Sequence, residues 1–252
     1  MTECDKLRFA LCANEGLTCK VARGENIGTY KEKRLHRVLK KFCEPDEACH
    51  EISIGPYVAD ILRGNEIIEV QSGSFYPMKS KIQYYLSNTD YFVTIVRPLP
   101  YIKWCIWLDG KSGEVVSRKK SSKKYLPRDV MRDWLFLCDY LGHERLKIKF
   151  LLLEEEEYRF LDGWSKDKKR GSSRYERIPI ALIDEMEFSL AEDYKIFLPD
   201  SIGESFTASE YIKASKMRSY GGYAALKILC HLGFIEKSDR RQGKSFVYKR
   251  LI

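Results

Sequence analysis

The segment from Tyr57 to Gln71 constrains the fold more than any other part of the sequence. It reads YVADILRGNEIIEVQ, two largely apolar runs separated by Gly64 and Asn65. A Gly-Asn pair tolerates the positive φ angles that a two-residue hairpin loop requires. The segment therefore predicts two antiparallel strands joined by a tight turn, and this pairing determines which side chains share a face.

Three polar residues interrupt the apolar runs of this predicted hairpin. Asp60 lies directly opposite Glu69 in the expected register, and Gln71 projects from the same face because strand residues alternate. Opposed carboxylates repel each other, and a divalent cation would remove that penalty. The alternative is that both acids lie on a solvated outer face without chemical function, and periodicity by itself favours this simpler interpretation.

The elements around the hairpin point to a particular fold. Apolar residues at helical spacing predict a helix from Thr29 to Phe42, and Pro77 suits the first turn of a second helix. Strands are predicted at residues 50–54, 57–62, 67–71 and 91–96. Helix, three strands, helix and strand, with Asp60 and then Glu-x-Gln on successive strands, resembles the PD-(D/E)xK nuclease superfamily over about residues 29–98.

The resemblance implies a metal-dependent phosphodiester hydrolase. The residues that match the superfamily's metal ligands are Asp60 and Glu69, with Glu32 of the first helix as an additional carboxylate. They would bind Mg²⁺ or Mn²⁺, which polarises the phosphate and generates a hydroxide nucleophile.

Gln71 stands where most members of the superfamily have lysine, and glutamine cannot supply a cation. Some members place the lysine on the following helix, where Lys79 and Lys81 flank an apolar stripe. Either is more often a solvated helix lysine, and of the two Lys81 is selected as the replacement. The substitution puts catalytic activity in doubt more than it does the fold.

The remainder of the first domain continues the α/β pattern. A hairpin with its turn at 109–113, an amphipathic helix at 127–141 and a further strand from residue 146 are predicted. The polar and basic segment 163–177 marks a domain boundary. We therefore predict a restriction-endonuclease-like domain at 1–162, a basic linker at 163–179 and a second domain at 180–252.

The second domain carries a different pattern. Thr207 and Glu210 form a capping-box sequence that opens one helix, and a second helix begins at Ser219 and is stopped by Gly233. Two alternating strands around the basic tip SDRRQGK complete the chain. This order resembles a winged helix-turn-helix domain over about residues 180–252, a fold that serves DNA binding and also protein binding.

Duplex DNA is the partner that these patterns favour. The second helix would read bases and the hairpin tip would contact phosphates. The candidate contacts are Ser219, Tyr220, Tyr223, Lys227, Arg240, Arg241 and Lys244, although either tyrosine could be a core residue instead. The stretch SRKKSSKK (117–124) and the basic residues of 166–177 add positive patches that fit phosphate or serve only as solubilising loops.

Composition limits the remaining alternatives. The net charge of +8 arises from 44 basic and 36 acidic residues, and eight cysteines contain no Cys-x-x-Cys pair, which disfavours structural zinc. Without a signal sequence or a long apolar run, a cytoplasmic protein with no membrane association is expected, and a homodimer is compatible with these features. The rivals to a nuclease are a DNA-binding regulator that lost catalysis through Gln71, and a module whose winged helix binds protein.

Overall fold

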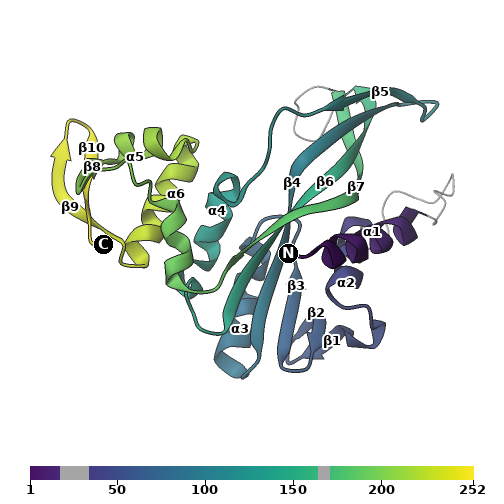
Figure 1. Cartoon of the computed structure of the whole chain (residues 1–252), viewed down its shortest axis with the longest axis horizontal. Coiled ribbons are helices and arrows are strands. Elements are labelled where there is room, and N and C mark those ends of the chain that lie inside the picture. The colour runs from purple at the N-terminus through teal and green to yellow at the C-terminus, as the bar shows by residue number, and fades with distance from the viewer. Residues whose placement is uncertain (18–33, 164–170) are drawn as a thin grey trace. The chain divides into compact units, whose positions relative to one another are not determined.

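The computed structural model describes residues 1–17, 34–163 and 171–252. This part of the chain divides into two compact units, and Figure 1 labels the helices and strands of both. The first unit comprises Met1–Arg63, Val96–Tyr125 and Phe150–Met186. The second comprises Gly64–Ile95, Leu126–Lys149 and Glu187–Ile252. Among the described residues, no helix is long and apolar enough to cross a membrane.

The fold is mixed α/β and contains a sheet of seven strands. The strand order is β1-β2-β3-β4-β6-β7, and β5 pairs with β4. The strands are β1 (His50–Ile54), β2 (Tyr57–Arg63), β3 (Glu66–Val70), β4 (Phe92–Asp109), β5 (Val115–Lys120), β6 (Leu146–Gly163) and β7 (Gly171–Phe188). The first three strands confirm the sequence prediction. The strand predicted at 91–96 and the first strand of the following hairpin are a single element, β4.

The loop between β2 and β3 is the predicted two-residue turn. Gly64 has a φ of 56°, in the left-handed region that glycine adopts without steric cost. Asn65 does not share it, since the non-glycine residues with positive φ in the described chain are Glu51 and Lys216. A positive φ at the first loop position alone is typical of a type II′ turn.

The predicted boundary at 163–179 is corrected by β7. Residues 171–179 of the expected linker form the first half of this strand, and residues 180–188, assigned from sequence to the second domain, form its second half. Strand β7 ends the sheet order, so it pairs on one side only and carries many polar residues. Composition alone does not separate such an edge strand from a loop.

Two helices belong to the first unit, α1 (Glu3–Leu17) and α2 (Arg34–Cys43). The apolar stripe predicted for α2 is buried, which the low exposure of Leu35, Val38 and Leu39 shows. Phe42 of the same stripe packs edge-on against Phe9 of α1, with ring centroids 5.2 Å apart. These contacts explain why the two helices pair, because each buries an apolar face on the other.

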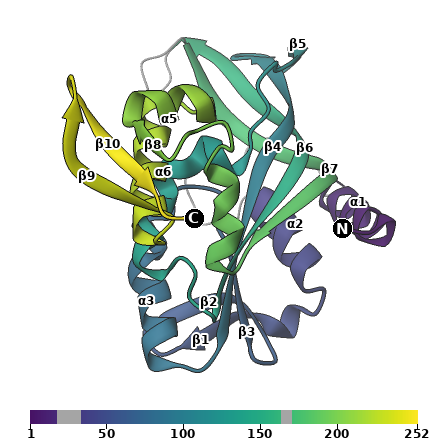
Figure 2. The ribbon, with the colours of Figure 1, turned by 60° about the vertical axis from the view of Figure 1, so that its left-hand side comes forward.

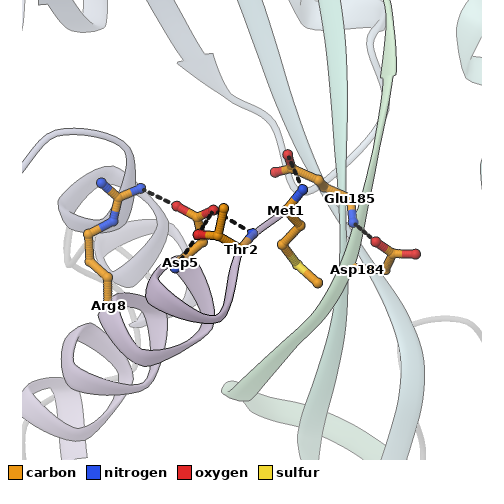
Figure 3. Close-up of polar contacts among 6 residues, drawn as sticks. All are labelled: Met1, Thr2, Asp5, Arg8, Asp184 and Glu185. Carbon is orange, nitrogen blue, oxygen red and sulfur yellow. Dashed lines mark hydrogen bonds and ion pairs between the residues drawn. The ribbon is translucent and has the colours of Figure 1, made fainter.

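The start of α1 is held by polar contacts, which Figure 3 shows. Thr2 and Asp5 exchange hydrogen bonds, from the Thr2 N–H to the Asp5 carboxylate at 2.9 Å and from the Asp5 N–H to the Thr2 hydroxyl at 3.2 Å. This arrangement satisfies N–H groups that the first helical turn leaves unpaired. The Met1 nitrogen lies 3.7 Å from Glu185 of β7.

In the second unit, the segment predicted as one helix at 127–141 is mostly 3₁₀. The only α-helical turn there is α4 (Met131–Trp134), and the flanking residues are 3₁₀ helices at Pro127–Val130 and Leu135–Tyr140. Trp134 is fully buried, with rings from Phe188, Tyr194 and Phe197 within 5.6 Å of its centroid. This aromatic packing is a tertiary contact, and the helical spacing of apolar residues in the segment gave no indication of it.

Other helices of the described chain flank the strands. They are α3 (Lys79–Asn88) and the 3₁₀ helices Glu47–Cys49, Tyr76–Met78 and Ala191–Phe197. The C-terminal elements are β8 (Ser205–Thr207), α5 (Ala208–Ser215), α6 (Ser219–His231), β9 (Ile235–Gln242) and β10 (Ser245–Arg250). The three strands form an antiparallel sheet in the order β8-β10-β9, and Figure 2 shows α5 and α6 beside it.

The capping box and the two predicted helices at the C-terminus are confirmed. The Thr207 hydroxyl accepts from the Glu210 N–H at 3.2 Å, and the Glu210 carboxylate accepts from the Thr207 N–H at 2.6 Å. That backbone hydrogen bond holds the pKa of Glu210 below its usual value. The tip of the hairpin is shorter than predicted. Arg240 and Arg241 lie on strand β9 and not in the loop between the strands.

Two adjacent glycines of α6 are expected to respond oppositely to the same substitution. A Cβ on Gly222 would lie 2.5 Å from Cγ1 of Ile212, whereas the nearest atom to one on Gly221 would be 3.7 Å away. Gly221→Ala should stabilise the protein by up to about 1 kcal/mol through helix propensity. Gly222→Ala should destabilise it by about 1–2 kcal/mol, because overpacking exceeds that gain.

Thermal melting of the two variants measures the difference directly. The expected gap of about 1–3 kcal/mol in the free energy of unfolding corresponds to roughly 2–12 °C in melting temperature for a chain of this size. Equal melting temperatures for the two variants would contradict the close packing of α5 on α6.

Candidate active site and nucleic-acid interface

Two of the predicted catalytic residues, Glu69 and Lys81, are in contact within the second unit of the described chain. Glu69 lies on β3 and is 3% exposed. The ammonium group of Lys81 donates to its Oε2 at 2.6 Å, and the Tyr85 hydroxyl lies 3.4 Å from its Oε1. Lys81 and Tyr85 are four residues apart on α3, so they project from the same side of that helix. A buried carboxylate is thus held by a lysine cation and a phenol.

Of the two lysines considered from sequence, Lys81 is the one in contact with Glu69. Lys79 begins α3 and is exposed, and its nitrogen lies 4.0 Å from the carboxylate of Asp139. Helix geometry explains the difference between the two lysines. Residues two positions apart are rotated by about 200° around the helix axis, so they project from nearly opposite sides.

Gln71 has a local role in the structure. It follows the last residue of β3, and its side-chain amide donates to the Ser74 carbonyl at 2.8 Å. Its side-chain oxygen lies 3.4 Å from the Gly73 N–H. These contacts organise the turn that leads to α3, so the amide is engaged with its own backbone segment, a common behaviour of short polar side chains after a strand.

Asp60 has a partner that the sequence did not suggest. It is half-buried on β2, and its Oδ1 lies 3.6 Å from Nε2 of His36 on α2. Asp60 has an imidazole beside it and Glu69 has an ammonium group, each within its own unit. A hydrogen-bonded or ion-paired carboxylate can stay ionised in a poorly hydrated place.

The predicted metal site at Asp60, Glu69 and Glu32 stays a prediction. Within the described chain, no group of three or more His, Cys, Asp or Glu side chains is arranged to hold a metal ion. Both oxygens of Glu69 already have donors within 3.4 Å, so a cation would replace Lys81 as the partner of that carboxylate. Glu32, the third predicted ligand, lies outside the described residues.

The outer face of α6 carries the predicted base-reading residues. Ser219, Tyr220, Tyr223 and Lys227 are all exposed, and the two tyrosines are 76% and 54% exposed. Tyr220, Tyr223 and Lys227 recur at helical spacing, so they form one stripe. The guanidinium of Arg132 lies 5.6 Å from the centroid of the Tyr220 ring. Neither tyrosine is a core residue.

The β9–β10 hairpin presents the predicted phosphate contacts. Arg240, Arg241 and Lys244 are exposed. Arg241 lies over the ring of Phe246 at 4.2 Å, and Lys237 lies over the same ring at 3.6 Å. These cation–π contacts order two of the positive charges on the hairpin before any ligand arrives.

Comparison with known proteins places the chain in a family. The sequence model of the family described as "Domain of unknown function (DUF8091)" matches residues 33–189. The chain belongs to this family. The DUF8091 segment covers more than half of the chain and runs from the start of α2 to the end of β7. No solved structure shows a significant match to the chain.

The chain is also similar to a protein of Treponema pallidum (strain Nichols) with the name "Uncharacterized protein". The two are 24% identical over 170 residues, which is 67% of this chain. The matched segment spans 64% of the relative's own length.

The DUF8091 segment contains the predicted catalytic residues of the strands and of α3, and it ends before the C-terminal helices and hairpin. Asp60, Glu69 and Lys81 lie within residues 33–189, whereas α6 and the β9–β10 hairpin follow that segment. Sequence reasoning missed two polar neighbours in the DUF8091 domain, His36 and Tyr85. His36 gave no signal beyond its place beside the apolar stripe of α2. Tyr85 lies at helical spacing from Ile82 among the buried residues of α3, and only its hydroxyl group distinguishes it from an apolar core residue there.

Proposed function

We propose that the protein binds duplex DNA through α6 and the β9–β10 hairpin. The observation that carries this proposal is the stripe of exposed residues on α6, in particular two tyrosines that are more than half exposed. Large aromatic side chains exposed together on one helix face favour a binding surface. The element order supports it, since helix, short turn, helix and antiparallel hairpin resemble the winged helix-turn-helix arrangement.

The chemistry of this surface suits a duplex. A helix of this kind enters the major groove with the residues of its exposed face toward base edges. The hairpin supplies cations that contact phosphates and release counterions, which gives affinity without sequence information. Tyr220 and Tyr223 would contact sugars, phosphates or base edges through their hydroxyl groups.

A second function, hydrolysis of phosphodiester bonds, is favoured by one contact, that of Lys81 with Glu69. In the PD-(D/E)xK superfamily that the sequence resembles, a carboxylate and a lysine act together, and Lys81 supplies the cation that Gln71 lacks. Asp60 and Glu69 are the residues that would hold Mg²⁺ or Mn²⁺, and the ion would activate water and stabilise the leaving oxygen. Lys81 would then turn from Glu69 toward the phosphate. A DNA-binding regulator without catalysis is the alternative.

The DNA-binding proposal is tested by removing three hairpin cations together. Arg240→Ala, Arg241→Ala and Lys244→Ala in one protein should weaken binding to a duplex and leave the melting temperature unchanged, because these side chains are exposed. The slope of log affinity against log salt should fall in magnitude by up to about 3, roughly one for each lost phosphate contact. Fluorescence anisotropy with a labelled duplex at several salt concentrations measures both quantities.

A matched control removes three positive charges elsewhere in the second unit, with Lys79, Lys147 and Lys195 replaced by Ala. This control lowers the net charge equally, so it corrects for non-specific attraction. A salt slope that is unchanged in the hairpin variant, or equally changed in the control, would reject a DNA role for the hairpin.

A further inference from the structure

A second surface, in the first unit, combines aromatic rings with cations. It is formed by β4, β5 and the segment that follows β5. Three rings each have a cation over their face: Arg118 at 3.7 Å and Lys120 at 5.5 Å from Trp104, Lys123 at 3.8 Å from Tyr125, and Lys124 at 4.8 Å from Tyr101. Of these residues, Trp104, Arg118 and Lys120 lie together on the β4–β5 ladder, and we name these three the β4–β5 surface. Lys120 is exposed.

The strand register places the central residues of this surface on one face. Trp104 is paired directly with Lys120, and Ile106 with Arg118, in the antiparallel β4–β5 ladder. Directly opposed residues share a face and alternate residues project the same way. Lys119, which is paired with Cys105, therefore projects from the opposite face.

Acidic residues of β6 hold Trp104 and Arg118 in place. The indole N–H of Trp104 donates to Glu154 at 2.7 Å, and Nε of Arg118 donates to Glu156 at 3.1 Å. Glu156 also accepts from the Tyr158 hydroxyl at 2.7 Å. Burial and this hydrogen bond raise the pKa of Tyr158 to about 12, so the phenol remains a donor at neutral pH.

Arg118 and Trp104 are therefore stacked before any ligand binds, and Arg118 remains partly exposed to solvent. The guanidinium of Arg118 lies on the Trp104 ring, while the Arg118 side chain remains 48% exposed. A planar guanidinium fixed on a ring is itself a platform on which a base can stack. Tyr101 has the alternation of Cys105 along β4, so it projects from the other face and is not part of this surface. The exposed Lys120 supplies charge for a phosphate beside the stack.

We propose that the β4–β5 surface binds unpaired nucleic acid, with a base stacking on Arg118 and with Lys120 contacting a phosphate. Unpaired strands expose the faces of their bases, whereas a duplex covers them, so a surface that offers stacking platforms favours single strands. This proposal goes beyond duplex binding by the C-terminal elements. It concerns residues of the first unit and requires neither a metal nor the β9–β10 hairpin.

The test compares two neighbouring lysines that differ in the face from which they project. Fluorescence anisotropy is measured with labelled oligo(dT) of about 20 nucleotides and with the same strand annealed to oligo(dA). Lys120→Ala should weaken oligo(dT) binding about three- to tenfold, and Lys119→Ala should leave it nearly unchanged. The two variants lose the same charge from the same strand, so a difference between them reports position alone.

Arg118→Lys tests stacking separately from charge. Lysine keeps the positive charge but lacks the planar group, and we expect about tenfold weaker oligo(dT) binding with little change for the duplex. If this variant melts early, Lys120→Ala, whose side chain is exposed, carries the test by its preference for oligo(dT) over the duplex.

Equal losses in Lys119→Ala and Lys120→Ala, or equal losses for oligo(dT) and duplex in Arg118→Lys, would overturn the proposal. The outcome is separable from that for the C-terminal elements. For the hairpin variant, the measured quantity is the affinity for the duplex. For the β4–β5 variants, it is the ratio of the affinities for oligo(dT) and for the duplex.

Discussion

Replacing Glu69 by Gln is expected to reduce Mn²⁺- or Mg²⁺-dependent DNA cleavage by about 100-fold or more, with duplex affinity unchanged. The substitution preserves the shape of the side chain and removes the negative charge that would hold the cation. Lys81→Met is expected to reduce the rate by about 100-fold as well, because a cation that stabilises developing charge contributes on this scale. Nicking of a supercoiled plasmid, with EDTA as the blank, measures the rates.

The matched control for Lys81 is Lys79→Met, since Lys79 lies on the same helix and pairs with Asp139 at the surface. Its cleavage rate should equal that of the wild type. A wild-type protein that never nicks DNA with either metal would reject the nuclease proposal and leave the DNA-binding regulator.

Stability must be measured beside activity, because Lys81 neutralises a buried carboxylate. Removing one partner of a buried pair typically costs about 3–5 kcal/mol, whereas replacing both can be neutral. The double variant Glu69→Gln and Lys81→Met should therefore recover much of the melting temperature that Lys81→Met loses, and it should remain inactive. Recovery of activity along with stability would show that the ion pair is structural only.

Replacing Arg145 by Met is expected to lower the stability of the protein, because Arg145 holds the end of α3. Its guanidinium donates to three carbonyls near the C-terminus of α3, those of Leu86 at 2.6 Å, Thr89 at 2.5 Å and Tyr91 at 3.3 Å. Hydrogen bonds from charged groups contribute about 1.5–3 kcal/mol each, and those to terminal carbonyls also favour the helix dipole. We expect a loss of about 2–4 kcal/mol for the set.

Chemical denaturation of Arg145→Met and of the control Arg128→Met measures the free energy of unfolding of each variant. Arg128 is an exposed arginine of the same unit, and its replacement should change the free energy of unfolding by less than about 0.5 kcal/mol. If the two variants unfold at the same denaturant concentration, Arg145 does not hold the end of α3 in solution.

Local features of this fold could be predicted because their causes lie within a few residues. The turn at Gly64, the capping box of Thr207 and Glu210 and the end of α6 at Gly233 each depend on backbone conformation or on hydrogen bonds across one helical turn. The segment 127–141 was predicted incorrectly for the opposite reason. Its apolar residues follow helical spacing, but packing around Trp134 favours 3₁₀ turns.

The candidate site was partly accessible to sequence reasoning. Lys81 could be selected because α3 begins soon after β3, and a side chain in its first turn can reach back to the strand. The local contact of Gln71 could not be predicted, since β3 ends before this residue and its amide donates to a carbonyl of the next turn. The contact of His36 with Asp60 joins a helix to a strand more than 20 residues later, and nothing in the spacing indicates it.

The sequence by itself determined the helices α5 and α6, the β9–β10 hairpin with its exposed basic residues, and the β2–β3 hairpin, because periodicity, capping and turn chemistry act over short distances. Only the tertiary structure decided that residues 171–188 form a strand of the large sheet, and that Glu69 is buried beside Lys81 and Tyr85. Both depend on which strands become neighbours. Strand pairing joins residues far apart in the chain, and the free energy that selects it comes from burial and hydrogen bonding of the assembled sheet.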